Sequence, residues 1–324
     1  MAFRLKLCPE KTNIDFFWAA PVTFGFSVFL MAASLVAWLT LGLNFGIDFR
    51  GGTTIRTEST QAVDVAAYRA ALEGQDLGDI SITEVFDPGF RADQHVAMVR
   101  IGAQDATQSI TPEQIGQVEE ALKTVDPSIT FPSVESVGPK VSGELIRSAI
   151  LAVAAACAGI AVYIWLRFEW QFALGSVAAL IHDVLVTIGV FALFQIKFDL
   201  TTVAALLTVL GYSINDTVVV FDRLRENLVK YKTMPLRDVM NLSVNETLSR
   251  TIMTLMTTLI ALVSLLVFGG DVIRGFVFAI TFGVVIGTYS SVYMAKNIVL
   301  YLGVDRGGPK KDSKAGTQFA NIDA

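Results

Sequence analysis

The sequence predicts an α-helical integral membrane protein with six transmembrane helices and an external α+β domain of ferredoxin-like βαββαβ order. The chain has 324 residues, of which 53% are hydrophobic and 17% are charged, and its mean hydropathy is +0.55. Such a composition is too apolar for a soluble domain. A helix needs about 20 apolar residues to cross the roughly 30 Å of hydrocarbon in a bilayer. Six such runs are present: 17–42, 146–166, 172–195, 200–222, 251–269 and 275–300.

Both ends of the chain are expected on the cytoplasmic side. An even number of spans returns the chain to its starting side, and short segments rich in Lys and Arg stay in the cytoplasm. We therefore predict a cytoplasmic segment at 1–16, a retained membrane anchor at 17–42 that is too long for a signal peptide, and a disordered cytoplasmic tail at 301–324. The basic residues that orient the chain are Arg4, Lys6, Lys11, Arg167, Arg223, Arg225, Lys230, Lys232, Arg237, Arg306, Lys310, Lys311 and Lys314.

Residues 43–141 form the long segment on the opposite side of the membrane. Alternating and helical spacings, broken by glycines and helix-capping residues, predict the order βαββαβ, which is typical of a ferredoxin-like domain. The expected elements are a strand with a glycine break at 44–58, a helix at Val63–Leu72, strands at Ile80–Phe86 and His95–Ile101, a helix at Pro112–Val125 behind Thr111, and a strand at Phe131–Val137.

This external domain shows no pattern of a catalytic or metal site. It has no His/Cys metal spacing, no phosphate-binding loop and no nucleophile with a nearby base. The two cysteines, Cys8 and Cys157, lie outside it, so it must fold without disulfides. We predict a contact domain rather than an enzyme, with no cofactor and no metal. No basic patch with interleaved aromatic residues indicates a nucleic-acid partner.

The five-helix remainder of the membrane domain, 142–300, includes a charged connection at 223–250. Its helical spacing and Pro235 predict a cytoplasmic helix pair that is broken at the proline. We interpret this pair as an interfacial linker, and a specific docking site is the alternative.

Ionisable residues inside the predicted spans carry the strongest functional signal. An acid at the bilayer centre costs about 2.5–3.5 kcal/mol, so such residues are rare and functional. Asp216 lies in the inner half of the fourth span, with Ser213 one turn before it and Asn215 beside it. Asp183 lies near the middle of the third span, beside His182.

Arg250, where the fifth span begins, is the candidate partner of Asp216. Thr254, Thr257, Thr258 and Ser264 follow it in a polar stripe that suits a hydrated crevice. The alternative is a static ion pair that fixes helix register. The pair His182 and Asp183 has an equally good structural interpretation, because His182 can bond to a backbone carbonyl of a neighbouring helix.

The last span has small residues four positions apart, which permits close approach of another helix. Gly283 and Gly287 are central to this stripe, which also includes Ala279, Ser291 and Ala295. We interpret it as a packing surface, and a surface that slides during a cycle is the alternative.

Five motifs in order closely resemble the SecF family of bacterial protein-export membrane subunits. They are G-I-D-F-R-G-G at 46–52, V-G-P-K-V-S-G-E-L at 137–145, L-I-H-D-V at 180–184, G-Y-S-I-N-D-T-V-V-V-F-D-R-L-R-E-N at 211–227 and N-E-T-L-S-R-T at 245–251. The resemblance implies a bacterial inner-membrane protein with residues 43–141 in the periplasm. It also implies kinship with one half of a resistance-nodulation-division transporter.

The resemblance further implies that the proton-motive force drives preprotein translocation and release. Asp216 matches the family's proton-coupling acid, and Arg250 matches its proposed partner. The implied partners are SecD, the SecYEG translocon with SecA acting indirectly, an unfolded preprotein and the lipid membrane. The hypothesis is that protonation of Asp216 weakens its attraction to Arg250 and moves the external domain.

Other functions also fit parts of the sequence. A passive scaffold of the export channel and a small-molecule proton antiporter remain alternatives. An intramembrane aspartyl protease using Asp183 and Asp216 is disfavoured, because Ser-Ile-Asn rather than Gly-x-Gly precedes Asp216. H⁺ is preferred to Na⁺ as the coupling ion because few ligating oxygens surround this acid in the sequence.

Overall fold

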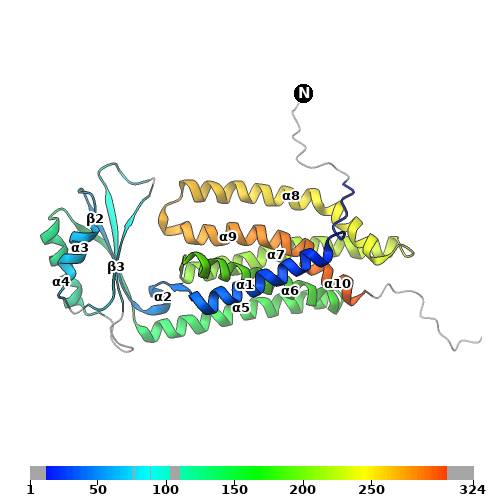
Figure 1. The fold of residues 1–324 in the computed structure, drawn as a ribbon, viewed down its shortest axis with the longest axis horizontal. Coiled ribbons are helices and arrows are strands. Elements are labelled where there is room, and N and C mark those ends of the chain that lie inside the picture. Colours follow the sequence, from blue (N-terminus) through cyan, green and yellow to red (C-terminus); the bar gives the residue numbers. More distant parts are fainter. Residues whose placement is uncertain (1–11, 76, 88, 103–109, 305–324) are drawn as a thin grey trace, which may run out of the picture.

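The computed structural model describes residues 12–75, 77–87, 89–102 and 110–304. The predicted amino-terminal segment up to residue 11, and residues 305–324 of the predicted tail, lie outside the described residues. A long helical bundle is joined at one end to a smaller domain built on a β-sheet (Figure 1).

The six predicted membrane helices are confirmed: six helices in the described part of the chain are long and apolar enough to cross a bilayer. The last of them contains a five-residue π-helix, η1. Their bounds are Ala20–Leu41 (α1), Pro139–Arg167 (α5), Trp170–Phe194 (α6), Leu200–Lys230 (α7), Leu236–Phe268 (α8), and Asp271–Ser290 (α9) continued by Ser291–Ala295 (η1) and Lys296–Leu302 (α10).

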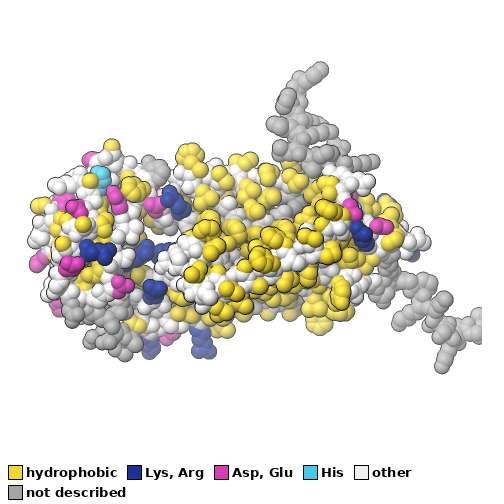
Figure 2. All heavy atoms as spheres, in the orientation of Figure 1, with side chains coloured by type: hydrophobic (Ala, Val, Ile, Leu, Met, Phe, Trp, Pro, Cys, Tyr) yellow, Lys and Arg dark blue, Asp and Glu magenta, His cyan; other side chains and the backbone are white. Residues whose placement is uncertain are grey.

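Helices α6 and α7 form the centre of the bundle. Half of the most apolar window of each is buried inside the chain, compared with 6% for α5 and α8. On the face seen in Figure 2, apolar side chains cover most of the bundle, whereas charged side chains gather on the sheet domain, at its junction with the bundle and at the far end of the bundle. The bundle therefore offers α5 and α8 to lipid or to a partner protein.

The predicted helix pair at 223–250 is corrected by the structure. These residues are not separate helices, because α7 continues to Lys230 and α8 begins at Leu236. Pro235 occupies the N-cap position of α8, where its missing N–H is no loss to the helix. Leu224 and Val239 are buried in one apolar cluster, and this packing lets both helices continue beyond their purely apolar segments.

The external domain has the predicted order of elements. Its four strands form one antiparallel sheet in the order β3-β4-β2-β5, with two helices of the same domain packed on it. The elements are Gly52–Ser59 (β2), Val65–Leu72 (α3), Ile80–Val85 (β3), His95–Gly102 (β4), Pro112–Val125 (α4) and Thr130–Val137 (β5). Thr111 caps α4 in a capping box with Gln114, as the sequence indicates.

The predicted strand at 44–58 is wrong in its first half. Asn44–Phe45 (β1) pairs in parallel with Lys197–Phe198 (β6), which lies between α6 and α7. A single helical turn, Ile47–Arg50 (α2), separates β1 from the sheet. A two-residue strand is too short to show a periodic pattern. The pairing also joins segments about 150 residues apart in sequence, so it cannot be predicted from local spacing.

Glycines in the segment after β1 allow it to lie against the membrane domain. A Cβ atom added at Gly46 would lie 2.9 Å from Lys197 and 3.2 Å from Asp199. Gly51 has φ +74°, a conformation that favours glycine, and packs against Pro139 at the start of α5. The external domain is therefore tied to the bundle at its base.

Candidate functional site

A polar cluster lies inside the bundle around the Asp183 carboxylate, which is fully buried. Nδ1 of His182 lies 3.0 Å from Oδ1 of Asp183. Ser213 of α7 and Ser290 of α9 donate hydrogen bonds to Oδ2, at 2.6 Å and 2.9 Å. A buried carboxylate is tolerated when polar partners surround it, and here the partners come from three helices.

The π-helix η1 extends this cluster. Oγ of Ser291 lies 2.7 Å from Oγ1 of Thr217 and also donates to the backbone carbonyl of Ser213 at 3.4 Å. A π-helical turn changes which side chains face a neighbour, and such turns are frequent at functional sites. Of two consecutive serines, Ser290 thereby bonds Asp183 of α6 and Ser291 contacts α7.

Asp216 lies beside the cluster in a different environment. Its side chain is 6% exposed, and Thr288 of α9 donates to Oδ2 over a long 3.4 Å. Asp183 therefore has three side-chain partners, whereas Asp216 has one weak partner. Asn215, its neighbour in sequence, points outward and is exposed.

Arg250 lies level with Asp216 but is not bonded to it. Asp216 is fourteen residues before the last residue of α7, and Arg250 is fourteen residues after the first residue of α8. None of the ion pairs among described side chains joins them, although the Arg250 charge lies close enough to act on Asp216. The charges of Asp216 and Arg250 therefore interact only at longer range in this structure. Arg250 itself is exposed.

The predicted small-residue stripe on the last span packs against α7 and the cluster. A Cβ atom added at Gly283 would lie 2.3 Å from Val209 Cγ2. A Cβ atom added at Gly287 would lie 3.0 Å from the Ser213 side chain and 3.4 Å from Asp183 Oδ2. Close approach of α9 at these glycines brings Thr288 and Ser290 within reach of the two acids.

The polar stripe on α8 has a more local role than expected. Thr254, Thr257 and Ser264 donate their hydroxyls to backbone carbonyls of α8 itself. Thr258 alone among these residues accepts from another helix, from Tyr212 of α7 at 3.4 Å.

The structure thus brings together Asp183, His182, Ser213 and Gly287. Asp216 lies beside this cluster and bonds Thr288, the residue after Gly287. Asn215 and Arg250 lie outside the cluster. Sequence reasoning missed the hydroxyl donors of the last span, for which the only signal was a pair of serines in an apolar run. No set of three or more His, Cys, Asp or Glu side chains is placed to hold a metal ion within 12–75, 77–87, 89–102 and 110–304.

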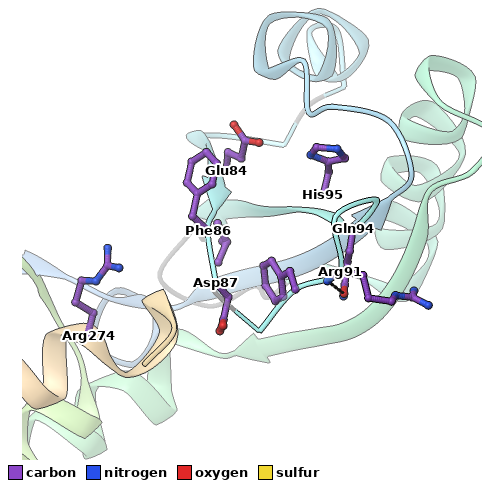
Figure 3. Close-up of a pocket in the computed structure, with 9 residues that line it drawn as sticks. Glu84, Phe86, Asp87, Arg91, Gln94, His95 and Arg274 are labelled. Atoms are coloured by element: carbon purple, nitrogen blue, oxygen red, sulfur yellow. Dashed lines mark hydrogen bonds between the residues drawn. The ribbon is translucent and has the colours of Figure 1, made fainter. Parts of the chain in front are cut away.

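Far from this cluster, the loop after β3 meets the turn between α8 and α9 (Figure 3). The backbone N–H of Phe86 donates to Asp271 Oδ2 at 2.9 Å, and Asp271 pairs with Arg274 at 2.5 Å. A Cβ atom added at Gly270 would overlap the Asp87 carboxylate, which would have to move. We call this contact of residues 86–87 with 270–274 the loop contact.

A cavity of about 410 Å³ opens beside the loop contact. Figure 3 shows Arg274 approaching it from the bundle and the other side chains from the sheet domain. It is lined by Glu84, Val85, Phe86, Asp87, Phe90, Arg91, Gln94, His95 and Arg274.

Comparison with known proteins assigns the family. The model of the protein export membrane protein SecD/SecF C-terminal family matches residues 117–305, and that of the SecD/SecF GG motif matches residues 36–63. The chain is 66% identical over 318 residues to the protein translocase subunit SecF of Rhodobacter capsulatus, with 96% of each chain covered. The chain belongs to the SecF family. Another SecF relative, from Ketogulonicigenium vulgare, is 55% identical with 98% of each chain covered.

Solved structures agree with the SecF assignment. SecDF from Thermus thermophilus, described as a translocon-associated membrane protein, matches with a TM-score of 0.80 and 33% identity. A SecDF structure in a super-membrane-facing form matches with a TM-score of 0.67 and 34% identity. The chain spans 39% of the length of each SecDF chain, and 91% and 90% of its own length is covered.

Proposed function

We propose that this chain is a subunit that uses the proton-motive force to promote preprotein translocation and release, together with a SecD subunit. Its SecF relatives are named protein translocase subunits, and the matching solved structures are of SecDF. The chain covers 39% of the length of those SecDF chains, and a partner of SecD type would correspond to the rest. The exposed apolar faces of α5 and α8 support such a partner and a lipid boundary. The SecYEG translocon, SecA acting indirectly, and the unfolded preprotein are further proposed partners.

The proposed orientation places both termini in the cytoplasm and residues 43–141 in the periplasm of a bacterial inner membrane. The asymmetry of basic residues supports it. We also assign the external domain to the ferredoxin-like class, because its sheet order and antiparallel pairing match a split βαβ arrangement.

The observation that carries the proposed mechanism is the pair of buried acids hydrogen-bonded to α9. Asp183 accepts from two serines and also contacts His182, whereas Asp216 has one long bond from Thr288 and is acted on by the Arg250 charge. Protonation of Asp216 removes its attraction to Arg250 and changes its bond to Thr288. The position of α9 against α7 therefore depends on whether Asp216 carries a proton.

The energy available is sufficient for such a switch. A charge that moves through 100 mV gains about 2.3 kcal/mol, which biases a two-state equilibrium by tens-fold. Because the start of α9 also bears the loop contact, a shift of α9 reaches the external domain directly.

The experiment measures preprotein release from membrane vesicles that carry this chain and its SecD partner. Wild type and Asp216→Asn are compared at equal membrane levels, with and without an imposed proton gradient. We expect only wild type to gain from the gradient. Asp222→Asn is the matched control, because this acid of the same helix is half exposed and pairs with Arg167 at 3.3 Å.

An equal response of wild type and Asp216→Asn to the gradient would contradict the proposal and favour the passive scaffold. The hydrogen bonds that Asp183 accepts from Ser213 and Ser290 are the observation that supports this alternative. Release driven by an imposed sodium gradient alone would identify Na⁺ as the coupling ion. Gradient-dependent efflux of a small solute by the chain without its partner would favour the antiporter.

A further inference from the structure

Lys296 is a buried lysine without a polar partner. Its side chain is 1% exposed, and its Nζ atom has no hydrogen-bond partner among the described residues. None of the carboxylates in the described part of the chain pairs with it. The Nζ atom instead lies 5.2 Å and 5.3 Å from the ring centres of Phe16 and Phe17, whose faces attract the amine when it carries a proton.

A continuous set of contacts leads from Lys296 to the polar cluster. The Phe16 ring lies 6.3 Å from the Tyr293 ring, and the Tyr293 ring lies 5.2 Å from the Tyr289 ring. The Tyr289 ring lies 6.2 Å from the His182 ring, whose Nδ1 meets Asp183. We call Lys296, Tyr293, Tyr289 and His182 the polar column.

Three buried polar atoms without partners lie on α6, one of them on His182 of this column. They are Nε2 of His182, Oγ of Ser176 and Oε1 of Gln171. Gly175 packs so closely on η1 that an added Cβ atom would lie 2.7 Å from the Ala295 carbonyl oxygen, which places Ser176 next to the helix of Lys296. Ser176 and His182 are six residues apart, a rise of about 9 Å along a helix.

Such a concentration of unpartnered buried atoms indicates internal water. Buried polar groups almost always have a partner, and a bound water supplies it where protein atoms do not. Lys296 Nζ, Ser176 Oγ and His182 Nε2 are all unpartnered and all buried to 1% exposure or less.

We propose that the polar column holds a chain of water molecules that carries protons between Asp183 and the end of the bundle where α1 begins. The inference rests on the proposed proton-driven function. His182 receives the proton of the Asp183 carboxyl at Nδ1 and gives its Nε2 proton to the adjacent water, so the imidazole remains neutral and charge is conserved. The proton then passes along the waters beside Ser176 and Tyr293 to Lys296.

The outlet of the column is covered by the segment before α1. Asn245 of α8 accepts from the backbone N–H of Ile14 at 2.9 Å and donates to its carbonyl at 2.8 Å. Asn241 accepts from the N–H of Phe16 at 2.9 Å. These bonds hold the two phenylalanine rings over Lys296.

The first test asks whether the column is hydrated, without reference to export. Ser176→Cys is made in the full chain with Cys8→Ser and Cys157→Ser, and its reaction with Ag⁺ in membranes is followed by loss of later maleimide labelling. Ser34→Cys is the matched control, because Ser34 is buried where α1 packs closely against Gly189 and lies outside the polar column. We expect the thiol at 176 to react about tenfold faster than the thiol at 34. Equal rates would show a dry column and overturn the proposal.

The second test measures proton flux through the chain and its partner in liposomes that contain a pH-sensitive dye. Tyr293→Phe and Lys296→Met should each lower the flux about tenfold or more, the usual scale for loss of a proton-transfer group. Tyr212→Phe removes a phenol on the α8 side of α7 and should leave the flux unchanged. Lys296→Arg should lower the flux as Lys296→Met does, because an arginine side chain stays protonated and cannot relay a proton.

The two tests separate failure of the column from failure of the proposed function. Wild-type flux in both Tyr293→Phe and Lys296→Met, in a complex that conducts, would place the path elsewhere and overturn the column. A complex that conducts no protons while Ser176→Cys reacts rapidly would contradict the proton-driven function, and would retain the column only as a hydrated channel.

Discussion

At the scale of single residues, the external domain is held by a buried acid far from the membrane. Asp126, at the end of α4, accepts hydrogen bonds from Ser59 and from the N–H and hydroxyl of Ser128, the latter two at 2.8 Å and 2.7 Å. Burial alone would raise the pKa of the Asp126 carboxyl, but the bonds from Ser59 and Ser128 outweigh it and hold that pKa below its ordinary value.

This acid predicts how the stability of the external domain depends on pH. A carboxyl with a lower pKa in the folded state stabilises the fold above its unfolded pKa of about 3.9, and this contribution is lost as the pH falls through the folded pKa. We expect Asp126→Asn to unfold more easily at neutral pH, by about 1–3 kcal/mol, and to lose less stability than wild type in acid.

Hydrogen exchange of residues 52–137 in the full chain, between neutral pH and acid, measures this effect. Asp93→Asn, at an exposed acid of the same domain, is the control and should behave like wild type. Equal protection of Asp126→Asn and wild type at neutral pH would refute the assignment.

A second residue-scale prediction concerns the glycines of α9. Gly283→Ala places a methyl group 2.3 Å from Val209, so it should destabilise the bundle by about 1–3 kcal/mol and lower its thermal unfolding midpoint in detergent. Gly211→Ala on α7 meets nothing within 4 Å and is the matched control. Equal midpoints for the two variants would mean that α9 does not depend on close approach at Gly283.

At the scale of elements, α9 is the link between the two parts of the molecule. Its last turn carries Thr288 and Ser290, which bond the two buried acids. Its first turn carries Asp271, which accepts from the external loop at Phe86. A displacement of this one helix therefore acts on both places at once.

The loop contact predicts that locking this link impairs function. An added Cβ atom at Gly270 lies 2.5 Å from Asp87 Cγ, which puts the two β-carbons within about 4 Å, the range that a disulfide needs. In a chain with Cys8→Ser and Cys157→Ser, the pair Asp87→Cys and Gly270→Cys should close under mild oxidation. We expect oxidation to reduce gradient-driven preprotein release and a reductant to restore it.

Each single cysteine variant serves as the control, and neither should respond to oxidant. Full activity of the disulfide-bonded protein would show that the loop contact stays closed throughout the cycle. In that case α9 would not move the external domain through it.

At the scale of the whole molecule, the chain by itself leaves a charged side chain exposed on one of its membrane helices. Arg250 is exposed on α8, a helix with 6% of its apolar window buried. A lone cation facing lipid is unfavourable, so a partner is expected to cover this face of α8.

Removal of this charge should therefore weaken assembly with SecD. We expect Arg250→Ala to lower the amount of SecD that copurifies with the chain in mild detergent. Arg225→Ala, on the extension of α7 beyond the predicted span, is the control, since its guanidinium already meets the carbonyl of Arg167. Undiminished copurification with Arg250→Ala would place the partner on another face.

Much of the architecture could be predicted because it depends on local patterns. Six apolar runs are sufficient to identify the spans, since each helix satisfies its own backbone hydrogen bonds in lipid. The order of elements in the external domain follows from alternation and capping residues such as Thr111. The predicted break at Pro235 is also real, although the two helices there are continuations of α7 and α8.

The candidate site was predictable only in part. Asp183, His182, Ser213 and Asp216 stand out by charge or polarity in apolar runs, but sequence placed the emphasis on Asp216 with Arg250. The structure instead surrounds Asp183 with polar partners from three helices and leaves Arg250 exposed. Distances between helices depend on packing at residues such as Gly287, and no single helix contains that information.

The sequence by itself determined the number of spans, the existence of the external domain, the acids inside the membrane and the family. Periodicity, composition and motif order are properties of contiguous residues, and they can be read along the chain. Only the tertiary structure decided which groups meet: Ser290 with Asp183, Phe86 with Asp271, and Lys296 with Phe16. These contacts join residues more than 100 positions apart, and the close packing of helices and domains creates them.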